Sequence, residues 1–204
     1  MPAAILHPIL HPSVESDSPP RIRFTRALVD QMLDAGLFEG QRFELIDGDI
    51  IDKMGQNPPH ATGVNRMLIY LIRVFGVEHI RVQQPIEVAR EDRELCWPEP
   101  DLTVVAEAKA DYETRHPAGT ELTLLVEVAD TSVRFDATRK RDLYARAGVP
   151  EYWVLDVSAR QLIVHRNPTQ GAYQQISTLS DKEMVAVESQ PDQPIPVSGL
   201  LPRS

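Results

Sequence analysis

Two acidic residues in the second half of the chain stand beside apolar runs. Asp101 opens the run LTVVA, and Glu127 lies inside the run LTLLVEV, which is continuous enough to be a strand buried on both faces. An ionised carboxylate is costly to bury without a partner, so an acid inside such a run indicates a site or a buried ion pair. Two carboxylates at the ends of neighbouring strands could hold one hard cation, because Mg²⁺ favours oxygen ligands.

A lysine follows on the next segment of the chain. Residues 136–147 have helical spacing, and Lys140 shares a face with Tyr144 and with Asp136, at i+4 and i−4. A lysine in that position could polarise a reacting group or stabilise negative charge that develops on a phosphate. We therefore expect Lys140 to lie beside Glu127, with Tyr144 as a further candidate for the site.

Each of these residues also has a structural explanation. Glu127 could form a buried ion pair with an arginine such as Arg134 or Arg139. A basic run is usually a solvated face, and Arg139 or Arg141 could take the place assigned to Lys140. For the aspartate of the first apolar run, the alternative is a surface turn acid that follows a proline.

The elements that must position these residues can be read in chain order. Apolar residues at helical spacing predict helices over residues 25–36 and 60–75. Between them, FELIDGDII predicts a β-hairpin turning at Asp47-Gly48, because this dipeptide tolerates the positive φ angles of a type I′ turn. Further strands are predicted over residues 80–89, 102–106, 122–128, 161–166, 173–178 and 184–188, and in the apolar run that ends at Asp156. This order indicates a mixed α/β fold with a central sheet.

The ends of the chain differ from its middle. Residues 1–22 hold five prolines and little periodicity, which predicts an extended arm, and residues 190–204 hold four prolines, which predicts a tail. Residues 23–189 show no internal repeat and no linker. We therefore expect one domain over residues 23–189.

Composition limits the classes of function. The chain has 204 residues, 42% of them hydrophobic, and a net charge of −9. A negative net charge argues against strong non-specific binding to nucleic acid. It does not exclude a local basic groove, because the field depends on where the charges lie. The single cysteine, Cys96, excludes an intrachain disulfide and a cysteine-based zinc site. No run approaches the ~20 apolar residues of a membrane span, and the start is no convincing signal peptide, so we expect a cytoplasmic protein.

Five stretches carry a family pattern: FELIDGDI, the helix start at His60, PEPDLTVV, LLVEVADTS and DATRKRDLYARAGVPEYWVLD. Together they resemble the Uma-two family, bacterial proteins of the PD-(D/E)xK restriction-endonuclease-like superfamily. The resemblance covers roughly residues 25–165 and is most specific in its later half. It implies a restriction-endonuclease-like fold, with a mixed central sheet flanked by helices.

The resemblance also implies roles for single residues. Asp101 matches the aspartate of the PD element, and Glu127 matches the acid of the (D/E)xK element. Ala129 stands where the superfamily has its lysine; in the Uma-two proteins the lysine has moved onto the following helix, which Lys140 matches. Glu44 matches an upstream acid that supports a metal or its water, although on a half-exposed strand it could face water instead.

The implied mechanism is metal-assisted hydrolysis of a phosphodiester. Asp101, Glu127 and the carbonyl of Val128 would hold Mg²⁺ or Mn²⁺, and Lys140 would orient or deprotonate the attacking water. His60 could shuttle a proton or contact a phosphate, or it could simply begin its helix.

The expected function is therefore that of a divalent-metal-dependent DNA endonuclease. The alternative is a catalytically idle nuclease fold that acts as a binding or assembly module. We expect a homodimer with either function, because cutting two strands suits two sites and the proline-rich arms could strap two subunits together.

Overall fold

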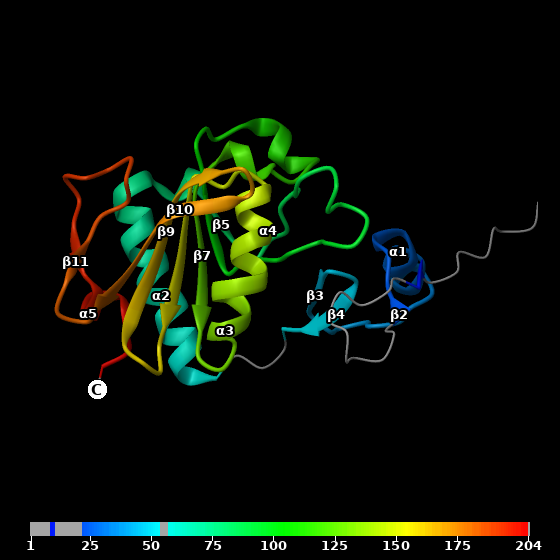
Figure 1. Ribbon diagram of the computed structural model, residues 1–204, viewed down its shortest axis with the longest axis horizontal. Helices are drawn as coiled ribbons and strands as arrows, with labels where there is room; N and C mark the ends of the chain where they lie inside the picture. The colour runs from blue at the N-terminus through cyan, green and yellow to red at the C-terminus, as the bar shows by residue number, and fades with distance from the viewer. Residues whose placement is uncertain (1–8, 11–21, 54–56, 204) are drawn as a thin grey trace, which may run out of the picture. The chain divides into compact units, whose positions relative to one another are not determined.

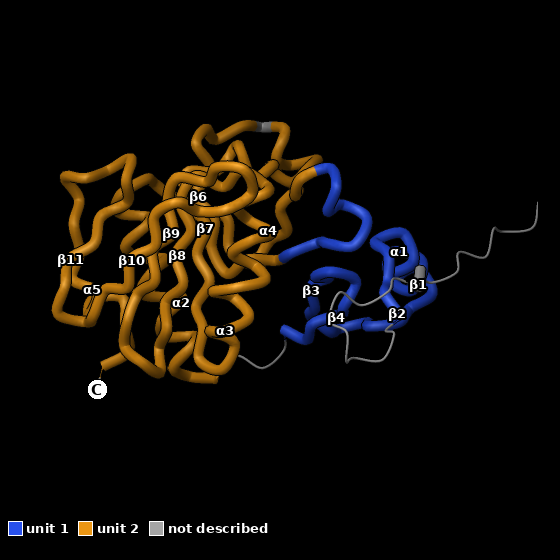
Figure 2. The backbone as a smooth tube through the Cα atoms, viewed as in Figure 1, with its two compact units in different colours: residues 1–55, 90–98 blue, residues 56–89, 99–204 orange. Residues whose placement is uncertain are grey.

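The computed structural model describes residues 9–10, 22–53 and 57–203, and the chain folds as two compact units (Figure 2). Unit 1 comprises residues 1–55 and 90–98, and unit 2 comprises residues 56–89 and 99–204. The arm predicted for residues 1–22 lies outside the described residues, except for β1 (Ile9–Leu10) and the first residue of β2 (Ile22–Arg23), which pair antiparallel.

Unit 1 contains the first helix and the predicted hairpin. Helix α1 (Arg26–Asp34) begins after Thr25, whose side chain accepts a hydrogen bond from the backbone N–H of Leu28. Strands β3 (Phe43–Ile46) and β4 (Asp49–Asp52) pair antiparallel. The two turn residues, Asp47 and Gly48, have φ angles of 51° and 77°. The hairpin prediction is confirmed, because both positive angles fit the turn expected for an Asp-Gly pair.

Unit 2 is built on a six-stranded mixed sheet, seen near edge-on in Figure 1. Its order is β10-β9-β8-β7-β6-β5, and every neighbouring pair is antiparallel except β7 and β8, which run parallel. The strands are β5 (Ile80–Val82), β6 (Leu102–Val105), β7 (Leu122–Ala129), β8 (Glu151–Asp156), β9 (Gln161–Thr169) and β10 (Ala172–Ser180). The predicted α/β class with a central mixed sheet is confirmed.

Helix α2 (Pro58–Phe75) covers one face of the sheet (Figure 1). Its buried Val64, Met67 and Leu71 pack in one cluster with Leu124 and Val126 of β7. Successive residues of a strand point to opposite faces, so Leu125 and Glu127 face the other way. That second face carries a helical segment made of α3 (Val133–Phe135), a π-helical turn η4 (Asp136–Lys140) and α4 (Arg141–Arg146).

Short elements complete unit 2. The 3₁₀ turn η1 (Val77–His79) joins α2 to β5, and the 3₁₀ turns η2 (Ala110–Glu113) and η3 (Gly119–Glu121) lie between β6 and β7. At the C-terminal end, β11 (Met184–Val185) pairs with β12 (Ile195–Pro196), and α5 (Val197–Leu200) follows. In the described parts of the chain, no helix combines the length and the apolar character that crossing a membrane requires.

Three expected segments differ from the structure. The strand predicted over residues 184–188 is shorter, because β11 ends at Val185. The strand predicted over residues 80–89 ends at Val82, because Gln83 takes a φ angle of 50° and leaves the extended conformation. The segment predicted as a tail folds back onto the sheet. Val197 and Leu200 are fully buried in the main core, so their apolar side chains outweigh the prolines around them.

Candidate active site

Glu127 is buried, and one of its carboxylate oxygens makes two contacts. Its Oε1 atom lies 2.8 Å from Nζ of Lys140 and accepts a hydrogen bond of 2.8 Å from the hydroxyl of Tyr144. The side chains of Glu127 and Lys140 are each 3% exposed. Lysine is almost never fully buried unless it is paired, so each of the two charges compensates the other inside the core. The structure thus places Lys140 beside Glu127, as expected from the helical spacing.

The π-helical turn η4 positions the lysine. Lys140 is its last residue, and Asp136, its first residue, lies with Oδ1 3.7 Å from Nζ of Lys140. Asp136 is itself held, because its Oδ2 atom accepts a hydrogen bond of 2.6 Å from Ser132 and its backbone carbonyl accepts one of 3.1 Å from Tyr152. The lysine ammonium therefore lies between two fixed acids.

Asp101 stands directly before β6, next to the strand that carries Glu127. Thr103 pairs with Leu125 in the antiparallel register of β6 and β7, so Asp101 continues that register opposite Glu127. Its Oδ2 atom accepts a hydrogen bond of 2.9 Å from the backbone N–H of Val128. The two acids that the sequence singled out are therefore cross-strand neighbours.

His60 reaches Asp101 from the start of α2. Its Nε2 atom lies 3.3 Å from Asp101 Oδ2, a distance that makes an ion pair when the imidazole is protonated. Gly63 lets the helix approach closely here, because a Cβ atom at this position would lie 2.9 Å from Cγ1 of Val128. The structure thus brings His60 to the carboxylates, whereas the sequence left its place open.

Asp130 is a residue that the sequence reasoning missed. It follows β7 and accepts hydrogen bonds from Ser158 and, at 2.5 Å, from Nδ2 of Asn57, the residue that caps α2. These two hydrogen bonds, with His60 nearby, lower the pKa of its carboxyl group. The sequence did offer one sign of a polar site here, because the polar residues DTS directly follow an apolar strand. Asp130 joins the start of the His60 helix to the end of the Glu127 strand.

The donor set can be compared with the needs of a metal ion. Within residues 9–10, 22–53 and 57–203, no three or more His, Cys, Asp and Glu side chains gather around one point as ligands. Mg²⁺ needs no such cage, because it is commonly held by one or two carboxylates together with water and substrate phosphates. Asp101 and Glu127, with the backbone carbonyl of Val128 beside them in sequence, fit that arrangement.

Glu44 belongs to the other unit. It lies on β3, is buried and pairs with Ile51 across the hairpin. Its predicted place in the acidic cluster stays a prediction, since the other candidates, Asp101 and Glu127 among them, belong to unit 2.

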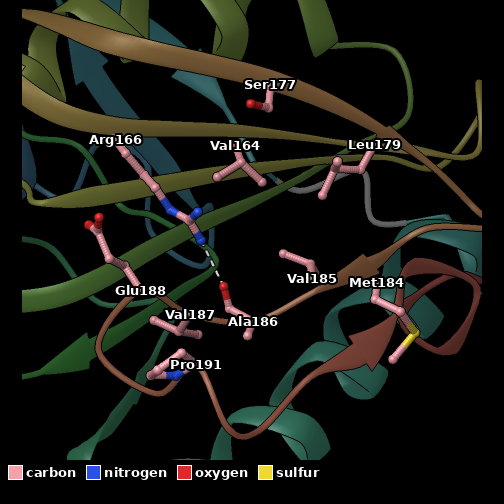
Figure 3. Close-up of a pocket in the computed structure, with 10 residues that line it drawn as sticks. All are labelled: Val164, Arg166, Ser177, Leu179, Met184, Val185, Ala186, Val187, Glu188 and Pro191. Atoms are coloured by element: carbon pink, nitrogen blue, oxygen red, sulfur yellow. Dashed lines mark hydrogen bonds between the residues drawn. The ribbon is translucent and has the colours of Figure 1, made fainter.

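A cavity of about 410 Å³ opens elsewhere in unit 2, between strands β9 and β10 and the segment that follows β10 (Figure 3). Its wall is mostly aliphatic, with Val164, Leu179 and Val185 pointing inward, and Arg166 lies at one end, where it donates to the carbonyl of Ala186. Its described lining residues include none of the candidate site residues. The acids therefore lie apart from this cavity.

Comparison with known proteins identifies the family and the fold of the chain. A family model described as "Uma2: Putative restriction endonuclease" matches residues 29–198. Among solved structures, the chain is similar to a protein from Anabaena variabilis described as "a putative nuclease belonging to DUF820". The TM-score is 0.62 at 15% identity, over 79% of this chain and 90% of that one, which shows a shared fold. No curated protein sequence matches significantly.

Proposed function

The chain belongs to the Uma2 family, and from this premise we propose that it is a divalent-metal-dependent endonuclease that hydrolyses phosphodiester bonds of DNA. The observation that carries the proposal is the buried contact between Lys140 and Glu127 beside Asp101. The two acids could hold a metal ion for phosphodiester hydrolysis, and the lysine beside them could stabilise the charge that develops on the phosphate.

Each side chain has a task that its position supports. Asp101 and Glu127, with the carbonyl of Val128, would hold Mg²⁺ or Mn²⁺, which when bound polarises the phosphodiester and makes a water acidic. Lys140 holds a positive charge where the attacked phosphate gains negative charge, and it can orient the incoming water. Tyr144 fixes the Glu127 carboxylate through its hydroxyl. His60, at Asp101, is placed to carry a proton or contact a phosphate.

Cleavage of plasmid DNA tests the proposal. With Mg²⁺ or Mn²⁺ present, the wild-type protein should cut, and Asp101→Asn or Glu127→Gln should lower the rate by at least about 100-fold, because each removes a proposed metal ligand. Glu107→Gln is a matched control, because this glutamate is 77% exposed. Circular dichroism should show that each variant folds. A wild-type protein that cuts neither DNA nor RNA with either metal would remove the proposal's support.

One observation favours a second function, that of a catalytically idle binding or assembly module. Glu127 already receives Lys140 and Tyr144 on a single oxygen, so the pair could serve the core alone. Metal titration by calorimetry separates the two functions. The enzyme should bind Mn²⁺ in a way that Asp101→Asn abolishes, whereas an idle module should show no such binding.

We also propose that the protein is a homodimer, because two sites suit the cutting of two strands. The edge strand β10 supports the proposal. Its nine residues contain no charged residue and no proline, the features that usually protect a sheet edge from pairing.

A further inference from the structure

A second cavity, of about 310 Å³, lies beside β5 at the opposite end of the sheet from β10. Its apolar wall includes Ile80 and Val105, and its polar side chains are those of Glu78, Arg81, Lys109, Tyr112 and Glu113. The volume is in the lower range of small-molecule sites. It suits a ligand about as large as a mononucleotide.

Two hydrogen-bond donors in this cavity have no acceptor among the described residues. The hydroxyl of Tyr112 and the Nε atom of Arg81 are both buried, and neither makes a hydrogen bond with any part of the chain that the structure describes. Tyr112 is only 9% exposed, and Arg81 lies with Cζ 5.6 Å from the centre of its ring. Buried donors are satisfied in nearly all folded proteins, so two in one cavity indicate a ligand that supplies acceptors.

Two acids, Glu78 and Glu113, line the cavity, and the charge of Arg81 is the feature that favours an anionic ligand there. The other two cations are neutralised, since Lys109 lies 3.0 Å from Glu121 and Arg115 contacts both Glu121 and Asp111. Arg81, by contrast, has no carboxylate within ion-pair distance among the described residues, and burial lowers the pKa of its guanidinium. An oxyanion between Arg81 and Tyr112 would satisfy both donors.

Most of the cavity lies beyond the end of β6, where Val105 and Lys109 line it, whereas Asp101 stands before the start of that strand. Arg81 pairs with Thr103 across β5 and β6, and Thr103 pairs with Leu125 across β6 and β7. These residues lie on the sheet face that carries Glu127, in the row next to Asp101 and Glu127. Rows on one face of a sheet lie roughly 7 Å apart, so Arg81 lies one row from Asp101, and Glu127 is one strand farther away.

We propose that this cavity binds the phosphate of one nucleotide unit, with Arg81 and Tyr112 donating hydrogen bonds to its oxygens. The unit is either part of the substrate strand or a free mononucleotide, and the first of these sources rests on the proposed function. A guanidinium and a phenol are suited to the task, since charge-assisted hydrogen bonds to phosphate are among the strongest that side chains make.

An ordered water is the competing explanation. The hydroxyl of Thr103 is buried beside Arg81 and also makes no hydrogen bond with the described residues, so one water could serve several of these groups. The two explanations differ in what the removal of a hydroxyl does. A buried hydroxyl that is hydrogen-bonded to an ordered water stabilises the fold. A buried hydroxyl that makes a hydrogen bond only when the ligand is bound does not stabilise the free protein.

Tyr112→Phe is therefore the first test. The variant should melt at the same temperature as the wild type or higher, because it loses a buried hydroxyl that makes no hydrogen bond. Its affinity for the ligand should fall by about tenfold, the usual effect of losing a hydrogen bond to a charged group. The probes are inorganic phosphate, thymidine 5′-monophosphate and a short single-stranded oligodeoxythymidylate. Binding is measured by calorimetry with EDTA present, so that the result is independent of catalysis.

Two further variants test the charge. Arg81→Lys keeps the charge but loses the Nε donor and should weaken binding of the same probes. Glu113→Gln removes a negative charge from the cavity wall and should tighten binding several-fold at low salt. Lys182→Met, at an exposed lysine, is the control and should change nothing.

Each outcome decides the proposal. Binding of the oligonucleotide alone, weakened by Tyr112→Phe and Arg81→Lys, supports a strand unit, and binding of the mononucleotide or of inorganic phosphate, weakened in the same way, supports a free ligand. Binding that neither variant changes, or no binding of any probe, overturns the proposal. A lower melting temperature of Tyr112→Phe without weaker binding assigns the hydroxyl to water and also overturns it. If the wild-type protein binds a probe but cuts no DNA, that result counts against the proposed function alone.

Discussion

At the scale of single residues, the ion pair of Glu127 and Lys140 combines its proposed catalytic task with a structural one. Both side chains are almost fully buried, and one glutamate oxygen receives both the lysine and Tyr144. Removing one member of a buried pair leaves the other charge unpaired, which costs more than the pair itself contributes. Activity measurements on either residue therefore need a stability measurement beside them.

The first prediction concerns this pair. Lys140→Met should lower the free energy of unfolding by about 3–5 kcal/mol, because Glu127 then keeps a buried charge without its lysine. The double variant Glu127→Gln/Lys140→Met should recover most of that loss. Urea unfolding of the two single variants and the double variant measures the coupling. Additive losses would contradict the prediction.

The second prediction concerns His165, a buried residue on β9. Burial is the main cause that lowers its pKa from 6.5 to about 4, and its ring stacks on Tyr152. The unfolded chain takes up a proton at higher pH than the folded one, so stability is complete above about pH 6.5 and falls as the pH drops toward 4. Between about pH 7 and pH 5 this effect amounts to roughly 2 kcal/mol.

His165→Phe keeps an aromatic ring but cannot titrate. Between about pH 7 and pH 5, the free energy of unfolding of this variant should therefore fall by roughly 2 kcal/mol less than that of the wild type. Urea unfolding at both pH values measures the difference. The carboxyl groups that titrate in this range are common to both proteins, so equal losses would show that His165 plays no part.

At the scale of elements, the start of α2 connects the helix to the site. Asn57 accepts a hydrogen bond of 3.0 Å from the backbone N–H of His60 and donates one to Asp130. His60 in turn lies at Asp101. One side chain thus caps the helix and ties it to the end of β7.

The third prediction separates these two tasks of Asn57. Asn57→Ala should lower the free energy of unfolding by about 1 kcal/mol through loss of the cap. Asn57→Asp keeps the cap but faces the charge of Asp130, so it should be destabilised at low salt and should recover at high salt, where the repulsion is screened. Thermal melts at two salt concentrations distinguish the variants. An aspartate variant that is insensitive to salt would contradict the contact with Asp130.

Local chemistry explains which elements could be predicted from the sequence. The Asp47-Gly48 turn and the cap at Thr25 depend on neighbouring residues, so each was visible in the chain. The position of Lys140 was also predictable, since helical spacing from Asp136 to Tyr144 survives the π-helical turn.

Long-range packing explains what could not be predicted. Strand β5 ends at Val82 and not at the predicted residue 89, because Gln83 leaves the extended conformation. The N–H of Gln83 donates a hydrogen bond to the carbonyl of Asp101, which lies 18 residues later in the sequence. Asp130 carries no local signal of its two partners, which come from distant segments. Val197 lies among prolines, yet its burial depends on a sheet formed far earlier in the chain.

At the scale of the whole molecule, the two ends of the sheet are unequal. Strand β5 has three residues and includes Arg81, whereas β10 has nine residues and no charge. Each has one neighbouring strand among the described residues. Ile176, at the middle of β10, is 51% exposed.

The fourth prediction follows from β10. If two copies pair through this strand about a two-fold axis near its middle, Ile176→Lys would place like charges opposite each other and shift the protein toward monomer. Met184→Lys, at a residue that is 55% exposed and outside β10, should leave the assembly unchanged. Light scattering coupled to size-exclusion chromatography measures both. A wild-type protein that is monomeric at high concentration would contradict the proposed dimer.

The inequality of the two sheet ends also decides how far such an assembly can grow. Pairing of β10 with β5 of another copy would leave a free edge each time and would build an open fibre. The short, charged β5 offers little for that contact. Pairing of β10 with itself uses the long edge of both copies at once, so growth ends at two chains.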